Sequence, residues 1–310
     1  MEFVHKSVLL AESVDALEIK ENGIYVDATA GGGGHSAEIL RRLKNGRLIA
    51  IDRDPDAVSV LTERFKGDDR VTIVNKNFSD IKQVLSELNI DGVDGILADL
   101  GVSSYQLDND ERGFSFHKDA PLDMRMDKSG LSARDVVNGY SESQLRDIIF
   151  RYGEEKFAKS IAANIVKERA KKPIETTSEL AEIIKYSIPA RARREGGHPA
   201  RRTFQALRIE VNRELELLPE AIDNMFSVLN GNGILAVITF HSLEDRIVKQ
   251  IFASYCKGCE CPKDFPVCVC GKVPQGELPF KSIEPSEAEI AENNRSRSAR
   301  LRAVRKLPKE

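Results

Sequence analysis

Hydrophobic positions in the first hundred residues fall into short continuous runs, and apolar residues at helical spacing follow most of them. Rich in β-branched residues, the runs predict four buried strands, at residues 24–27, 47–51, 70–75 and 95–100. The spacing after each of the first three predicts a helix. Strands that alternate with helices in this way predict a parallel sheet whose two faces are both covered.

The pattern changes after residue 107, and no convincing strand appears until after residue 208. The loop 108–130 is polar but contains Phe, Leu and Met residues, which favours an ordered functional loop over disorder. Helical patterns follow at residues 141–152, 154–170 and 177–188.

Strand and helix patterns return in the last hundred residues. The spacing predicts one helix from about 203 to 229, a turn at 230–233, a very apolar strand at 233–240 and a helix at 243–255. We therefore expect one α/β domain, formed by residues 1–106 and 211–310, with residues 107–210 as a helical insertion for substrate binding.

A glycine-rich turn follows the first predicted strand. The strand ends in Asp27, glycines occupy positions 31–34, and a helical pattern begins at once. Glycines let the backbone approach a ligand closely, and the start of a helix offers unpaired N–H groups. A strand, turn and helix of this kind typically hold a nucleotide-like cofactor. The alternative is a flexible surface loop, which we disfavour because four glycines beside a buried strand are entropically costly.

Acidic residues at strand ends bear on which cofactor is bound. A pyrophosphate disfavours a neighbouring carboxylate such as Asp27, whereas S-adenosylmethionine carries a sulfonium, an ammonium and ribose hydroxyls but no phosphate. Asp52 suits the ribose of either this cofactor or NAD. Phe78 and Asp99 fall at the same carboxyl edge of the sheet, and Phe78 is either an adenine contact or a core residue. Asp27 favours S-adenosylmethionine.

Composition and charge set limits on the partners. The 310 residues are 41% hydrophobic and 31% charged, with a net charge of -3, so a nucleic-acid role has to rest on local clusters. Arginines gather at 191–208 and in the tail 295–306, and each cluster is either an RNA contact or a solvated face. No apolar run long enough to span a membrane and no signal peptide is visible, so we expect a cytoplasmic protein with no membrane partner.

All five cysteines lie between residues 256 and 270, in the pattern C-x2-C-x-C-x6-C-x-C. The spacing is compatible with zinc, but C-x-C is tighter than the usual zinc knuckle. We therefore favour a thiol-rich surface loop and expect no metal.

Six motifs together resemble the ribosomal RNA small subunit methyltransferase H family over nearly the whole chain; they lie at 27–36, 52–54, 99–108, 112–116, 121–127 and 294–299. The resemblance implies an α/β class I methyltransferase (Rossmann-like) fold, with a parallel sheet, helices on both faces and an inserted all-helical subdomain. It implies methyl transfer from S-adenosylmethionine to N4 of a cytidine in the decoding region of 16S ribosomal RNA, with the RNA or the small ribosomal subunit as partner. The cofactor residues that it implies are Gly33, Gly34, His35, Asp52, Phe78, Asp99 and Gln106.

The proposed reaction needs an acceptor for the target amino group. The N4 lone pair of cytosine is delocalised into the ring, and an acceptor for the amino protons draws it back onto nitrogen. Candidate catalytic residues are Asp99, Ser103 and Ser104, or a backbone carbonyl of their loop, and Phe114 or Phe116 is a candidate platform for the unstacked base.

Three alternatives stay open from the sequence. They are methylation of another RNA or DNA amino group, an NAD-dependent oxidoreductase, and a non-catalytic RNA-binding protein. The sequence does not predict the oligomeric state.

Overall fold

The computed structural model describes residues 7–194, 197–259, 261, 267 and 269–308. They divide into two compact units: Met1–Gly101 with Leu215–Glu310, and Val102–Glu214. The division expected at 106/107 and 210/211 would cut through two helices, α5 (Ser104–Asp108) and α10 (Arg201–Asn212), which the structure keeps whole in the second unit.

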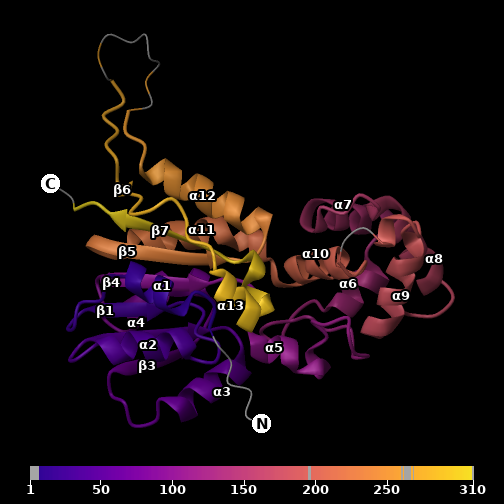
Figure 1. The fold of residues 1–310 in the computed structure, drawn as a ribbon, viewed down its shortest axis with the longest axis horizontal. Helices are drawn as coiled ribbons and strands as arrows, with labels where there is room; N and C mark the ends of the chain where they lie inside the picture. Colours follow the sequence, from indigo (N-terminus) through magenta and orange to yellow (C-terminus); the bar gives the residue numbers. More distant parts are fainter. Residues whose placement is uncertain (1–6, 195–196, 260, 262–266, 268, 309–310) are drawn as a thin grey trace. The chain divides into compact units, whose positions relative to one another are not determined.

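The first unit is built on a seven-stranded sheet with the order β3-β2-β1-β4-β5-β7-β6 (Figure 1). Its strands are β1 (Ile24–Asp27), β2 (Arg47–Asp52), β3 (Val71–Asn75), β4 (Val93–Asp99), β5 (Leu229–Thr239), β6 (Gly276–Glu277) and β7 (Arg300–Lys306). The first five strands pair in parallel, and β7 pairs antiparallel with both β5 and β6. The four strands predicted in the first hundred residues are confirmed.

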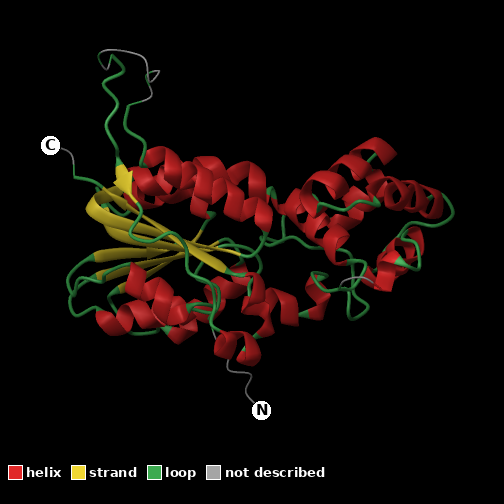
Figure 2. Cartoon of the chain, turned by 45° about the horizontal axis from the view of Figure 1, so that its top comes forward, coloured by secondary structure: helices red, strands yellow, loops and turns green. Residues whose placement is uncertain are grey.

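Helices cover both faces of this sheet (Figure 2). They are α1 (Leu10–Ala16), α2 (Gly34–Arg42), α3 (Pro55–Arg64), α4 (Ile81–Glu87), α11 (Glu214–Ser227), α12 (Ser242–Tyr255) and α13 (Glu287–Glu292), with 3-10 turns η1 (Phe78–Asp80) and η4 (Asn294–Ser298). Successive strand residues enter opposite cores: Val26 and Ile96 pack with residues of α4, α11 and α12, while Tyr25 and Leu97 pack with residues of α1 and α2. Because both faces are buried, these strands read as continuous apolar runs.

The second unit is helical. It contains α5, η2 (Asp110–Arg112), α6 (Ala133–Gly139), α7 (Glu142–Gly153), α8 (Ala158–Arg169), α9 (Thr177–Ser187), η3 (Ala192–Arg194) and α10. Side-chain capping boxes begin several of these helices, at Ser132, Ser141 and Thr176. A separate apolar core, with Leu145, Ile161 and Leu207 fully buried, holds them together.

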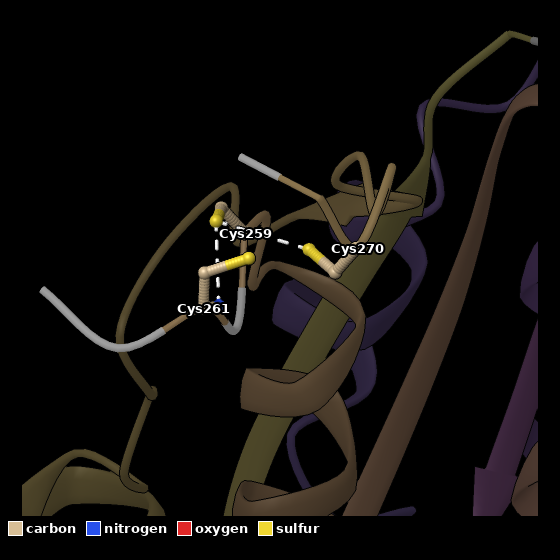
Figure 3. Close-up of side chains that lie close together, drawn as sticks. All are labelled: Cys259, Cys261 and Cys270. Atoms are coloured by element: carbon tan, nitrogen blue, oxygen red, sulfur yellow. Dashed lines mark hydrogen bonds between the residues drawn. The ribbon is translucent and has the colours of Figure 1, made fainter. Parts of the chain in front are cut away.

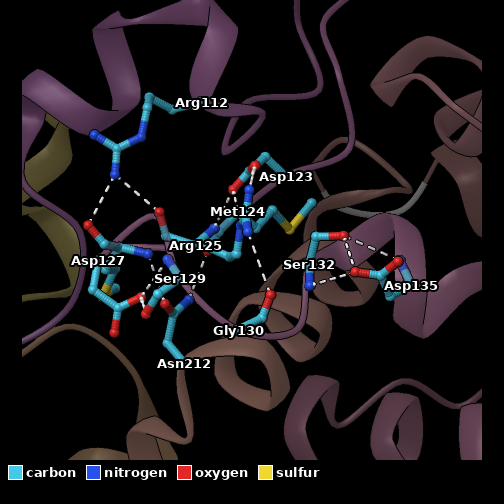
Figure 4. A network of polar contacts seen from close by, with 11 residues as sticks. Arg112, Asp123, Met124, Arg125, Asp127, Ser129, Gly130, Ser132, Asp135 and Asn212 are labelled. Atoms are coloured by element: carbon cyan, nitrogen blue, oxygen red, sulfur yellow. Dashed lines mark hydrogen bonds and ion pairs between the residues drawn. The ribbon is translucent and has the colours of Figure 1, made fainter.

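The loop 108–130 is ordered by buried polar contacts within the second unit (Figure 4). The buried Arg112 guanidinium donates to the carbonyl oxygens of Arg125 and Met126, both at 2.9 Å. The Asn212 side chain accepts from the Met126 N–H and donates to the Met124 carbonyl, both at 2.8 Å. These contacts confirm that the loop is structured.

Three predicted details were wrong. The helix expected at 203–229 is two helices, because Arg213 takes a left-handed conformation (φ 52°) between α10 and α11. The turn expected at 230–233 belongs to strand β5, whose pairing with β4 is irregular between Val93 and Gly95. Helix α6 was missed between the polar loop 108–130 and the helix predicted at 141–152. No described helix is long and apolar enough to cross a membrane.

Candidate active site

The glycine turn between β1 and α2 adopts a backbone that its sequence requires. Gly31 and Gly33 have left-handed φ values of 51° and 77°. A Cβ on Gly33 would lie 2.9 Å from the Cδ2 atom of Leu61, whereas a Cβ on Gly32 would meet no atom within 4 Å. Gly33 therefore cannot carry a side chain, whereas the space beside Gly32 is open. A turn that holds a ligand needs both features.

Asp52 holds this turn in place. Its Oδ2 atom accepts from the Gly31 N–H (2.7 Å) and its Oδ1 atom from the Asp54 N–H (2.8 Å). Burial raises the pKa of Asp52 to about 6. A carboxylate offers roughly four acceptor positions, so these two bonds leave room for further donors.

Asp27 is fully buried and acts inside the fold. It accepts from the Ser36 hydroxyl (2.6 Å), which lies in the first turns of α2, and burial raises its pKa to about 6. This contact ties the end of β1 to the helix that follows the glycine turn. Asp27 therefore stabilises the glycine turn from the buried side.

His35 presents a neutral imidazole at the start of α2. Its Nε2 atom lies 3.0 Å from the Val8 carbonyl oxygen and has to carry the proton, so Nδ1 is unprotonated. Burial lowers the pKa of His35 to about 4. Nδ1 lies 3.8 Å from Asp99 Oδ2, too far for a hydrogen bond. The histidine thus adds no positive charge beside Asp99.

Asp99 ends β4 and carries an unsatisfied polar atom. Its backbone N–H donates to Thr29 Oγ1 (2.6 Å), but its buried Oδ1 atom has no hydrogen-bond partner among the described residues. Burial, with the negative charges of Asp27 and Glu244, raises the pKa of Asp99 well above its usual range. Buried polar atoms are nearly always paired, so an orphan of this kind indicates a ligand position. A cationic ligand such as S-adenosylmethionine fits it.

Phe78 begins η1, directly after β3. The Asn77 side chain accepts from the Ser79 N–H (3.1 Å) and fixes this turn. The Phe78 side chain is half-buried and packs partly against the sheet core. Both expectations for Phe78, adenine contact and core residue, are compatible with that position.

The remaining predicted residues lie on the second unit. The Ser103 hydroxyl accepts from the Gln106 N–H (3.2 Å), and Gln106 Oε1 accepts from the Ser103 N–H (3.0 Å). This capping box starts α5, and it gives both side chains a local structural role. Ser104 is the first residue of α5, and its side chain lies outside the described part of the chain.

Two residues at the start of α12, His241 and Glu244, were missed by sequence reasoning. The Glu244 carboxylate is buried and accepts from the backbone N–H groups of Phe240 (2.9 Å) and His241 (3.3 Å). Its negative charge contributes to the raised pKa of Asp99. The signal was available, because His241 and Glu244 form a capping-box spacing directly after a very apolar strand.

The sheet and its edge define the class of protein. Five parallel strands, an antiparallel β7, a glycine turn after β1 and acidic residues ending β1, β2 and β4 make up a class I S-adenosylmethionine-dependent methyltransferase domain.

Sequence comparison gives the family. The MraW methylase family matches residues 2–307, and the chain belongs to this family. It is 57% identical to "Ribosomal RNA small subunit methyltransferase H" of Clostridium botulinum (strain Kyoto / Type A2), over 99% of this chain and 100% of the relative. It is 56% identical to the protein of the same name from Lachnospira eligens, over 99% of each chain. Among solved structures, a putative rRNA methylase from Clostridium thermocellum matches at 13% identity and a TM-score of 0.47, covering 98% of this chain and 100% of that one.

Proposed function

We propose that this methyltransferase transfers the methyl group of S-adenosylmethionine to N4 of a cytidine in the decoding region of 16S ribosomal RNA. The relatives' name supports a small-subunit ribosomal RNA substrate. The observation that carries the proposal is the buried, unpartnered Oδ1 atom of Asp99 at the carboxyl edge of the sheet. Such an acceptor suits a cationic cofactor or an amino group.

Each side chain of the first unit has a distinct role in this proposal. Asp52 accepts from the ribose hydroxyls while it holds the glycine turn through Gly31. Gly33 and Gly34 supply the backbone of the turn, where the missing Cβ atoms leave room for Leu61 and Ser7, and Phe78 packs beside the adenine. His35 stays neutral, which avoids repulsion beside a sulfonium. The bound cofactor supplies an already activated methyl group, so the protein acts mainly by placing the two reactants in line.

Asp99 has two possible tasks, which make different kinetic predictions. If its carboxylate binds the ammonium of the cofactor's methionine moiety, its loss weakens cofactor binding. If it accepts from the target amino group, its loss lowers the rate at saturating cofactor. We propose Asp99 as the catalytic residue. Ser103 and Ser104 remain secondary candidates, and the capping contact of Ser103 favours a positioning role for its hydroxyl.

We propose that the helical insertion carries the RNA-binding surface. Arg201 and Arg202 are exposed at the start of α10. Tyr186 is 71% exposed, and the Lys185 and Arg193 cations lie 5.5 and 5.9 Å from the centre of its ring. An exposed aromatic ring with two cations close to it suits an unpaired base and its phosphates.

Other candidate RNA contacts have partners within the protein. In the tail, Arg302 forms an ion pair with Asp245 (2.7 Å), and Arg305 pairs with Glu18. Both charges are therefore balanced by a carboxylate, whereas Arg202 donates to a backbone carbonyl, that of Glu154 (3.2 Å).

The two aromatic candidates for the target base differ in accessibility. Phe114 is buried in the core of the second unit, whereas Phe116 is half-buried and stacks on His198 at 4.4 Å. Phe116 is the better candidate of the two. Because the substrate is ribosomal RNA, the proposal also places the protein in the cytoplasm.

Labelled methyl transfer tests the proposal. Small subunits isolated from cells that lack this protein are incubated with it and with radiolabelled S-adenosylmethionine, in parallel with protein-free 16S ribosomal RNA. We expect the label in one cytidine of the decoding region. Label at another region of the RNA, or no label with either substrate, would contradict the proposal.

A further inference from the structure

The cysteine-rich segment joins α12 to β6, and its described valines have little apolar packing. A hydrogen bond joins the two ends of the segment: the Gln275 N–H donates to the Tyr255 carbonyl oxygen (2.8 Å). Beyond this point, Val267, Val269 and Val273 are 70%, 73% and 69% exposed. Apolar burial therefore contributes little to the described part of the segment, and another interaction has to hold it.

Three cysteine sulfur atoms converge in this segment (Figure 3). The Sγ atoms of Cys259, Cys261 and Cys270 all lie within 4.8 Å of one another. The distance from Cys259 Sγ to Cys270 Sγ is 3.8 Å. Two thiolates at about 2.3 Å from a tetrahedral zinc ion are about 3.8 Å apart, whereas a disulfide bond is about 2.05 Å long. The spacing of this pair fits metal ligands.

Backbone donors point at two of these sulfur atoms. The Cys261 N–H donates to Cys259 Sγ, and the Val269 N–H donates to Cys261 Sγ, each at 3.4 Å. Hydrogen bonds to a sulfur atom favour its thiolate form, and the thiolate is the form that binds metal. The segment thus orients its thiols and lowers the cost of deprotonating them.

We propose that Cys259, Cys261 and Cys270 bind one zinc ion as thiolates, and that the ion cross-links the segment between α12 and β6. Soft thiolate ligands select zinc over hard cations such as Mg²⁺. The sequence favoured a loop without metal because C-x-C is a tight spacing, but Cys270 reaches the other two from the returning part of the segment.

A fourth described cysteine of this segment, Cys256, is not part of the proposed site. Burial and the nearby Glu277 carboxylate raise the pKa of Cys256, which disfavours its thiolate. Cys268 lies outside the described residues. Each thiol that binds releases its proton to solvent, so zinc affinity rises with pH.

Metal content tests the proposal directly. The protein is purified under reducing conditions from zinc-supplemented medium, and zinc is measured by elemental mass spectrometry. We expect about one zinc ion per chain, as for a structural thiolate site. The Cys259→Ser/Cys270→Ser variant is expected to lose it, and the matched control Cys256→Ser is expected to keep it. Unchanged binding of S-adenosylmethionine by the double variant shows that the sheet domain is still folded.

Proteolysis gives a second readout that is independent of activity. A chelator should speed cleavage of the wild-type segment, and the double variant should be cleaved at the fast rate without chelator. Wild-type protein without stoichiometric zinc, or a double variant with wild-type zinc content, would overturn the proposal. Zinc loss in Cys256→Ser would contradict the ligand assignment.

Discussion

Replacement of Asp99 by Asn should make the protein more stable and less active. The substitution keeps the side-chain shape and removes an ionisable group whose charged form is disfavoured by burial and by the negative charges of Asp27 and Glu244. An amide has no ionised form, so the variant avoids the cost of ionising this buried group, which is about 1.4 kcal/mol for each unit by which the pKa is raised. We therefore expect the free energy of unfolding of the cofactor-free protein to rise by at least about 1.4 kcal/mol at neutral pH.

The pH dependence of this gain has a defined sign. The pKa of Asp99 is raised in the folded protein, so the native carboxyl still holds a proton that the unfolded chain has released. Wild-type stability therefore falls relative to Asp99→Asn as the pH rises above about 4, the unfolded pKa, until the native pKa is passed. The difference between the two proteins should be small at lower pH. Chemical unfolding at several pH values measures it.

The functional effect is measured on the same preparations. At saturating S-adenosylmethionine we expect single-turnover methyl transfer by Asp99→Asn to fall about 10²-fold, which corresponds to about 2.7 kcal/mol of transition-state stabilisation. Calorimetry of cofactor binding shows whether the substitution also weakens binding of S-adenosylmethionine in the ground state.

Asp94→Asn is the matched control, because Asp94 lies on the same strand but at its opposite end. It accepts from the Ile24 N–H (3.0 Å) and from Lys20 Nζ (3.1 Å). We expect lower stability and normal turnover per folded molecule. An Asp99→Asn protein with reduced stability and parental turnover would show that Asp99 is a structural residue, and would refute the reasoning.

Three further predictions concern the glycine turn and the RNA surface. Asp52→Ala should weaken S-adenosylmethionine binding by about 1–3 kcal/mol, because it removes an acceptor; an unchanged calorimetric affinity would count against the ribose assignment. Gly33→Ala should destabilise the fold by at least about 1–2 kcal/mol in thermal unfolding, while Gly32→Ala should not, since only Gly33 has both positive φ and a close neighbour. Exchange of Arg201 and Arg202 for Gln should reduce the salt dependence of RNA binding by about one unit of slope per lost phosphate contact; an unaltered slope would mean that these arginines are only solvated.

The elements that the sequence predicted are those determined by local pattern. Strands β1 to β4 are buried on both faces, so each one appears as an apolar run between polar ends. No local pattern of apolar and polar residues indicates the break between α10 and α11. It depends on Arg213 and on the Asn212 side chain, which bonds the Met124 carbonyl far away in the sequence.

The same contrast applies to the candidate site. The glycine turn and the acidic strand ends were recognisable, because position after a strand is a local property. The orphaned oxygen of Asp99, the bond from Gly31 to Asp52 and the pairing of Arg302 with Asp245 depend on residues that only the tertiary fold brings together. The sequence therefore indicated the location of the site, but not which side chains already have partners.

The identity of the methylated atom tests the proposed reaction most directly. Small subunits are methylated with deuterated S-adenosylmethionine, the 16S ribosomal RNA is digested to nucleosides, and the products are separated and identified by mass spectrometry against synthetic standards. The proposed reaction predicts that the deuterated methyl group is recovered in N4-methylcytidine, and that Asp99→Asn strongly reduces this product. Recovery of the label in 5-methylcytidine, in a ribose-methylated nucleoside or in a purine would contradict it.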